Sequence, residues 1–159
     1  MGVVVPTEDS IKSVVGGLFD KELEFEAVPC AAWNRLEPVT MAIYASDDGK
    51  PLGIFLCDVG LAAHAAAALV LLPATKSAMC AEGGYIDDEL LENFHEVANV
   101  ASGLFNSPST PRVALRDLLS PPVEVPRDAR PILIAPSARI QLEMSIEGYG
   151  KGRMTLLCA

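Results

Sequence analysis

Two apolar runs separated by a short polar turn constrain the fold of this chain more than any other feature. The runs are "VTMAIYAS" at residues 39–46 and "PLGIFLCDV" at residues 51–59, and the turn between them is Asp47-Asp48-Gly49-Lys50. An Asp-Gly pair between apolar runs is a strong hairpin signal, because glycine accepts the positive φ of a tight turn at no steric cost. The chain therefore contains a pair of antiparallel strands.

The segment before this hairpin predicts a capped helix and one more strand. Thr7 is a suitable N-cap for a helix that ends near residue 20, with apolar positions at Ile11, Val14, Val15 and Leu18. The stretch "ELEFEAV" at residues 22–28 then alternates glutamate with apolar residues, which predicts a half-buried strand. We expect this strand and the two strands of the hairpin to form a meander.

The segments after the hairpin predict two helices and a second hairpin. Residues 59–72 are rich in alanine and stop at Pro73, which predicts a helix packed on the sheet. Residues 74–85 contain a Gly-Gly pair, and we expect a mobile loop there before a helix at residues 87–106. The following proline-rich segment leaves room for short strands at most, and residues 138–159 alternate around a glycine-rich turn.

This order of elements predicts an α+β fold with a largely antiparallel sheet and helices packed on one face. At 159 residues the chain is long enough to bury about two thirds of the surface that its unfolded form exposes, and we expect a single domain over residues 1–159. The sequence has neither a Walker loop nor a G-x-G-x-x-G after a strand. A nucleotide-binding βαβ unit is therefore not predicted.

Charge and hydropathy exclude several classes of partner. The net charge of -9 and the pI near 4.6 argue against nucleic acid, because an acidic surface repels a phosphate backbone. The most apolar window, residues 60–73, is shorter than the roughly 20 residues that span a bilayer, so no membrane association is expected. The N-terminal residues lack the basic stretch and apolar core of a signal peptide, so we expect a cytoplasmic protein. The 4 cysteines form no C-x-x-C pair, and we expect thiols without a disulfide.

The helix expected at residues 87–106 carries an acidic row that packing alone does not explain. At 100° per residue, one side of this helix holds Glu89, Glu92, Glu96, Asn99 and Gly103, opposite an apolar side of Leu90, Phe94, Val97, Ala101 and Leu104. Glutamates one turn apart repel each other, and no lysine on the helix is spaced to relieve them. Acidic residues complement the dipole of the first turn, which accounts for Glu89 but not for the residues farther along.

A metal site on this helix is an alternative. Glu92 and His95 have the i, i+3 spacing of carboxylate-bridged metal sites. Such a site needs a matching motif on a second helix, and the sequence has none. We therefore predict no metal ligand in this protein.

The same helix carries a motif with a known counterpart. Glu96-x-x-Asn99, with Gly103 four residues later and Pro122 after a gap of 22 residues, resembles the signature of the CheC, CheX and FliY chemotaxis phosphatases. That signature is Asp or Ser, three residues, Glu, two residues, Asn, 22 residues and Pro. Two positions depart from the pattern: Glu92 stands in place of the Asp or Ser, and Leu104 stands where CheX-like proteins commonly have Asn. The first half of the chain has no second Glu-x-x-Asn, so one site per chain is implied, as in CheX.

The resemblance implies a CheC/CheX-like fold and a hydrolase of two-component signalling that acts on the phosphoaspartate of a CheY-type response-regulator receiver domain. In this assignment Asn99 orients the attacking water and Glu96 docks on the receiver lysine. Glu92 extends the acidic contact, and Gly103 permits close approach. The phosphorylated receiver is the expected partner and supplies the Mg²⁺, so the chain is expected to hold no cofactor of its own.

Two further expectations accompany this resemblance. The protein is expected to be a homodimer, because exposed edge strands of such a sheet can pair across a two-fold axis. The alternative to a phosphatase is a non-catalytic adaptor of the same fold that binds a receiver or a flagellar-switch-like partner. The departures at Glu92 and Leu104 favour the adaptor.

Overall fold

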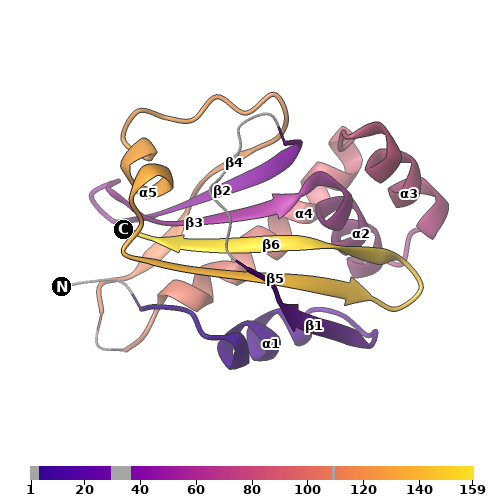
Figure 1. The fold of residues 1–159 in the computed structure, drawn as a ribbon, viewed down its shortest axis with the longest axis horizontal. Helices are drawn as coiled ribbons and strands as arrows, with labels where there is room; N and C mark the ends of the chain where they lie inside the picture. The colour runs from indigo at the N-terminus through magenta and orange to yellow at the C-terminus, as the bar shows by residue number, and fades with distance from the viewer. Residues whose placement is uncertain (1–3, 30–36, 109) are drawn as a thin grey trace.

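The computed structural model has a six-stranded antiparallel sheet covered by helices (Figure 1). It describes residues 4–29, 37–108 and 110–159. The strands follow the order β1-β5-β6-β3-β2-β4 across the sheet. Their bounds are β1 Leu23–Ala27, β2 Val39–Ser46, β3 Pro51–Asp58, β4 Val113–Leu119, β5 Ala138–Ile146 and β6 Gly150–Cys158. The predicted α+β class with a largely antiparallel sheet is confirmed.

Helices α1, α2 and α4 cover one face of the sheet, α3 packs on α2, and the short helix α5 covers part of the other face. The helices are α1 Glu8–Gly16, α2 Val59–Leu69, α3 Ala74–Gly83, α4 Asp88–Ala101, the 3₁₀ helix η1 Ser102–Phe105 and α5 Arg130–Ile134. The larger apolar core lies between the sheet and α1, α2, α4 and η1, and in it the rings of Phe55 and Phe94 lie 6.3 Å apart. On the opposite face Ile132 and Leu133 of α5 cover Met41 and Ile54. The expected placement on one face thus holds for α1, α2 and α4, and α5 is an addition on the other face.

The hairpin predicted at residues 39–58 is the centre of the sheet. β2 and β3 pair from Val39 opposite Asp58 to Ala45 opposite Pro51, and Gly49 in the turn has a φ of 83°. β2 also pairs with β4, and β3 with β6, so both strands are interior and almost wholly buried. Continuous apolar runs suit such positions, because both faces of the strands are covered.

The expected meander of three consecutive strands is wrong. β1 pairs with β5, where Phe25 lies opposite Met144, and it forms the edge of the sheet farthest from β4. The apolar side chains of β1 still pack on the larger core, through Leu23 and Phe25. Alternation specifies which side of a strand is buried, but it does not specify which strand is its neighbour. Cys30, one of the cysteines considered above, lies outside the described residues.

The expected loop at residues 74–85 is also wrong, because this segment forms α3. Pro73 stands at the N-cap, where its missing amide leaves no intrahelical bond unmade, and Gly84 ends the helix with a left-handed φ of 70°. Within α3, Ser77 and Cys80 are buried. The Gly-Gly pair therefore terminates a helix rather than opening a loop. Two other helices end earlier than expected, α1 at Gly16 and α2 at Leu69.

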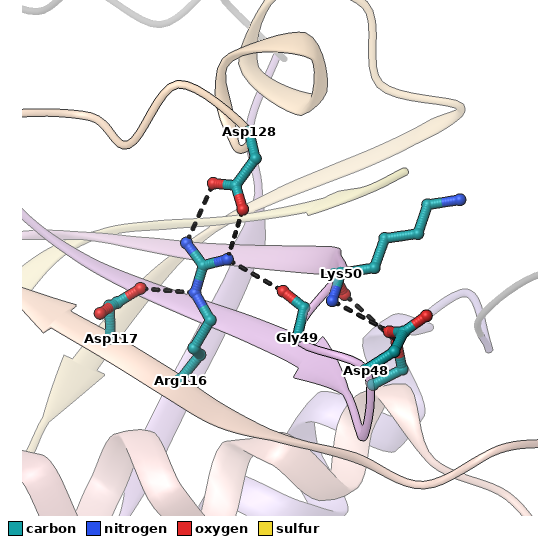
Figure 2. A network of polar contacts seen from close by, with 7 residues as sticks. Asp48, Gly49, Lys50, Arg116, Asp117 and Asp128 are labelled. Atoms are coloured by element: carbon teal, nitrogen blue, oxygen red, sulfur yellow. Dashed lines mark hydrogen bonds and ion pairs between the residues drawn. The ribbon is translucent and has the colours of Figure 1, made fainter.

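A guanidinium at the β4 edge joins three distant segments (Figure 2). Arg116 forms a bidentate pair with Asp128, with N···O distances of 2.7 and 3.1 Å, and it also donates to the carbonyl of Gly49 at 3.0 Å. Its Nε donates to Asp117 at 2.6 Å. The hydrogen bond from Arg116 lowers the pKa of Asp128, so this carboxylate stays charged. These contacts fasten β4 to the β2–β3 turn and to the segment that precedes α5.

Two further findings concern membrane spans and thiols. Within the described residues no helix combines the length and the apolar character needed to cross a bilayer. Cys57, Cys80 and Cys158 are buried free thiols. Burial raises the pKa of the Cys57 thiol well above its ordinary value, as expected for an unreactive core cysteine.

Candidate functional site

The acidic row lies on the solvent side of α4, as the helical periodicity predicts. Glu89, Glu92, Glu96 and Asn99 are exposed along α4, and Gly103 is exposed in η1 directly after it. The opposite side of the helix is buried in the larger core, through Leu90, Phe94, Val97 and Ala101. We call the exposed set Glu92, Glu96, Asn99 and Gly103 the α4 face. All site residues predicted from the sequence therefore share one surface.

The first turn of α4 is bound to α3. Asp87 caps the helix, since its Oδ1 accepts a hydrogen bond from the Leu90 amide at 2.8 Å. Lys76 of α3 donates to Glu89 at 2.7 Å and lies 3.9 Å from Asp87. The hydrogen bond with Glu89 raises the pKa of Lys76. Glu89 thus has a structural partner, and it belongs to the scaffold rather than to the α4 face.

The remaining carboxylates of the row are not neutralised in this way. Across residues 4–29, 37–108 and 110–159, no Lys, Arg or His nitrogen lies within 4.0 Å of a carboxylate of Glu92 or Glu96. The two side chains are one turn apart, so their charges repel. This repulsion between Glu92 and Glu96 destabilises α4 locally. A cationic group on another molecule would relieve it.

The C-terminal end of α4 is hydrogen-bonded to the sheet. Tyr44 of β2 is fully buried and donates its hydroxyl hydrogen to the carbonyl oxygen of Ala98 at 2.7 Å. Burial raises the pKa of the Tyr44 phenol well above its ordinary value, so the group remains a protonated donor. The contact reaches the helix backbone one residue before Asn99.

Asn106 fastens the segment after η1 to the edge strand β4. Its Nδ2 donates to the carbonyls of Ser102 at 2.8 Å and Val113 at 2.7 Å, and its Oδ1 accepts from the Val113 amide at 2.7 Å. One side chain thereby bonds both backbone groups of Val113 and a carbonyl in the last turn before the strand. The α4 face is therefore tied to the rest of the fold at both ends, through Lys76 at the first turn and through Tyr44 and Asn106 at the last.

The two departures from the CheX-like signature fall in different places. Leu104 is only 3% exposed and packs in the larger core, so it adds nothing to the exposed surface. Glu92 is exposed beside Glu96 and adds a carboxylate to the α4 face. Gly103 is open, since a Cβ placed on it meets no atom within 4 Å. Pro122 is exposed in the segment between β4 and α5.

The chemistry available on this surface is that of a carboxylate and a carboxamide one turn apart. Small molecules bind in concave apolar pockets, whereas an exposed helix face suits contact with another protein. In the part of the chain that the structure describes, no group of three or more His, Cys, Asp or Glu side chains is placed to hold a metal ion. Glu92 and His95 thus lack a third ligand among those residues.

Reasoning from the sequence missed the residues that support this face: Lys76, Tyr44 and Asn106. A signal existed for Tyr44, because a tyrosine in a continuous apolar strand needs a partner for its hydroxyl. No signal indicated which carbonyl this partner is. That contact joins residues 54 positions apart and depends on the tertiary fold.

Several solved structures have the same fold as this protein. No protein-family model matches the chain, and no curated protein matches it. Among solved structures, the CheX protein in a CheX-CheY-BeF3-Mg²⁺ complex from Borrelia burgdorferi matches with a TM-score of 0.53 and 12% identity, over 94% of this chain and 92% of that one. FliY of Thermotoga maritima matches with a TM-score of 0.54 and 12% identity, over 94% of this chain and 83% of that one.

FliM has the same architecture. A structure of the FliG-FliM complex from H. pylori matches with a TM-score of 0.54 and 10% identity, over 94% of this chain and 85% of the matched chain. The protein is thus an α+β domain with the fold that CheX, FliY and the FliM middle domain share. The resemblance found in the sequence is confirmed at the level of the fold.

Proposed function

We propose that this protein is a phosphatase that hydrolyses the phosphoaspartate of a CheY-type receiver domain, with the α4 face as its docking and catalytic surface. The observation that carries the proposal is the exposed pair Glu96 and Asn99, one turn apart on a helix that is anchored to the sheet. Their fold is that of a CheX protein that was solved in complex with CheY. The receiver supplies the phosphoaspartate and the Mg²⁺, so the reaction needs few groups from the phosphatase. The pair Glu96 and Asn99 is therefore enough.

Asn99 is assigned to the attacking water. Its carboxamide offers a donor and an acceptor, so it can fix both the position and the orientation of one water molecule in line with the phosphorus. Attack by this water forms a bond to phosphorus and breaks the bond between phosphorus and the aspartate oxygen. The products are inorganic phosphate and the free receiver carboxylate, and the second proton of the water goes to solvent.

Glu96 is assigned to docking on a lysine of the receiver. A carboxylate one turn before Asn99 forms a charge-assisted contact with that lysine and so sets the register of the docked helix. The absence of an internal cation near Glu96, within the described residues, leaves it available for this partner. Glu92 extends the acidic contact by one turn, and Gly103 leaves room for the backbone of the receiver.

The metal ion of the reaction belongs to the receiver in this proposal. Mg²⁺ bound there neutralises charge on the phosphoryl oxygens. The α4 face contributes no metal ligand. Its residues bind the receiver, orient the attacking water and exclude other solvent. Such a protein works in the compartment where receivers are phosphorylated, the cytoplasm.

A non-catalytic adaptor of the same fold is the second candidate. FliM, which has this architecture, was solved in complex with FliG, so the fold also serves assembly. Glu92 favours this candidate, because it adds a docking charge where the phosphatase signature has Asp or Ser. In the adaptor the α4 face binds a receiver without altering the lifetime of its phosphoryl group.

One experiment separates the two candidates. The decay of a phosphorylated CheY-type receiver is followed with no addition, with the wild-type protein and with Asn99→Ala. We expect acceleration by the wild type and a loss on the order of 10²-fold in the variant, as when one preorganised polar group is removed from other enzymes. Asn93→Ala is the matched control, because it makes the same change about 120° away around the helix.

The outcomes are distinct. Acceleration that survives Asn99→Ala would exclude the assigned role of Asn99. Binding of the receiver without any change in decay, across several receivers, would replace the phosphatase with the adaptor.

We also propose a homodimer formed by edge strands of the sheet. Of the edges β1 and β4, β1 is the shorter and carries Glu24 and Glu26, which repel a second copy. The charged side chains of β4 are already paired within the chain, through Arg116 and Asp117. We therefore place the contact at β4. A sedimentation profile with only monomer at tens of micromolar would refute the dimer.

A further inference from the structure

Tyr44 occupies an irregular point of the sheet directly beneath the end of α4. The pairing of β2 with β3 shifts register between Tyr44 and Ala45, and the pairing of β2 with β4 shifts between Ile43 and Tyr44. Bulges of this kind bend a strand and redirect a side chain. Here the side chain of Tyr44 reaches the carbonyl of Ala98, at 2.7 Å.

The helix backbone changes its hydrogen bonding at the same place. In a continuous α-helix the amide of Ser102 would donate to the carbonyl of Ala98, four residues earlier. Here the Ser102 amide donates to the carbonyls of Asn99 and Val100, and the chain continues as the 3₁₀ helix η1. The hydroxyl of Tyr44 supplies a donor to the buried Ala98 carbonyl at this transition.

Packing around Tyr44 supports the same junction. The ring of Phe105, at the end of η1, lies 5.0 Å from the Tyr44 ring. Gly53 stands opposite Tyr44 in β3, and a Cβ on Gly53 would lie 2.5 Å from the Phe105 ring. The glycine therefore makes room for the aromatic side chain that seats η1 on the sheet. The junction between α4 and η1 is therefore stabilised by the hydrogen bond from Tyr44 to Ala98 and by packing of the Phe105 ring on Tyr44.

We propose that Tyr44 is a positioning residue for the α4 face: its hydroxyl fixes the junction between α4 and η1 and so holds the Asn99 carboxamide and Gly103 in register with Glu96. This inference rests on the function proposed above. Glu96 lies before the anchored carbonyl, whereas Asn99, in the last turn of α4, and Gly103, in η1, lie after it. Loss of the hydroxyl therefore displaces the catalytic amide more than the docking carboxylate. The turnover number therefore depends on this contact more strongly than the affinity for the receiver does.

The test compares two tyrosines that make the same kind of bond. Tyr44→Phe removes the hydroxyl and keeps the ring that packs on Phe105. Tyr149→Phe is the matched control, because the Tyr149 hydroxyl donates to the carbonyl of Leu72 at 2.8 Å, beyond the end of α2 and away from the α4 face. We expect Tyr44→Phe to lower kcat for the phosphorylated receiver about tenfold with KM within about twofold of the wild type, because a small misplacement of an orienting group is costly. Tyr149→Phe should leave both constants unchanged.

A second measurement does not depend on the phosphatase. Hydrogen exchange of the amides from Asn99 to Gly103 should quicken about tenfold or more in Tyr44→Phe and remain at the wild-type rate in Tyr149→Phe. If neither kcat nor this exchange changes in Tyr44→Phe, or if Tyr149→Phe changes them equally, Tyr44 is not a positioning residue. If the wild-type protein fails to accelerate dephosphorylation, the proposed function fails, and the exchange rates alone decide whether Tyr44 fixes the junction.

Discussion

Helices α2 and α4 pack against each other on the same face of the sheet, yet they leave very different surfaces outside. α2 is enclosed by β6, α3 and α4, and all but its Gly60 and Leu69 are buried. Its one polar side chain, His64, is bonded to Ser77 of α3 at 2.8 Å. α4 is buried on one side and keeps an acidic row on the other. A helix closed on every side contributes stability, and a helix with one open side can also carry function.

The largest expected effect is a charge inside α2. Ala66 is 0% exposed, so Ala66→Asp places a carboxylate without a partner in the core. We expect the free energy of unfolding to fall by about 3–5 kcal/mol, measured by urea denaturation. Asn99→Asp adds the same charge to the α4 face and should change stability by less than about 0.5 kcal/mol. Equal losses in the two variants would abolish the distinction between the helices.

The next effect comes from adding one methyl group beside each helix. A Cβ on Gly150 would lie 2.6 Å from Nε2 of His64 in α2, so Gly150→Ala should destabilise the fold by about 1–3 kcal/mol. A Cβ on Gly103 meets nothing within 4 Å, and Gly103→Ala should raise stability by up to about 1 kcal/mol, because it restricts the unfolded chain. Thermal unfolding of both variants checks this. Destabilisation by Gly103→Ala would mean that the α4 face is not open.

A smaller effect is expected for a neutralised charge on the α4 face. Glu96→Gln keeps the size of the side chain and removes the charge that is assigned to the receiver lysine. Binding of the phosphorylated receiver should weaken about tenfold at low salt, and less at high salt because ions screen the contact. Titration calorimetry at two salt concentrations measures this. Glu89→Gln, whose partner is Lys76, is the control and should leave binding unchanged.

The smallest effect is a pH dependence located in α2. Burial lowers the pKa of His64 below its ordinary value of 6.5. The unfolded chain therefore binds more protons than the folded chain just below that pH, so stability falls as the pH decreases through 6.5 and levels off below the folded-state pKa. His64→Gln should flatten this slope in unfolding experiments between pH 5 and 7, whereas His95→Gln on α4 is the control. A slope that persists in His64→Gln would assign it to another group.

The orientation of α4 followed from the sequence because helical periodicity is local. Leu90, Phe94 and Val97 recur at the spacing of one helix face, so the exposure of Glu96 and Asn99 opposite them could be predicted. The β2–β3 and β5–β6 hairpins followed for the same reason, since strand alternation and turn residues lie within one segment. The helix at Ala74–Gly83 was missed although its signals are also local. Pro73 and Gly84 mark the start and end of a helix as readily as they mark a loop.

The sequence by itself determined the α+β class, the hairpins and the side of α4 that carries Glu96 and Asn99. These features depend on periodicities of 3.6 and 2 residues and on turn chemistry, which act between near neighbours. Only the tertiary structure decided that β1 pairs with β5, that Lys76 takes Glu89 out of the acidic row, and that Tyr44 holds the carbonyl of Ala98. Each of these contacts joins residues far apart in the chain, and its geometry exists only once the core has packed.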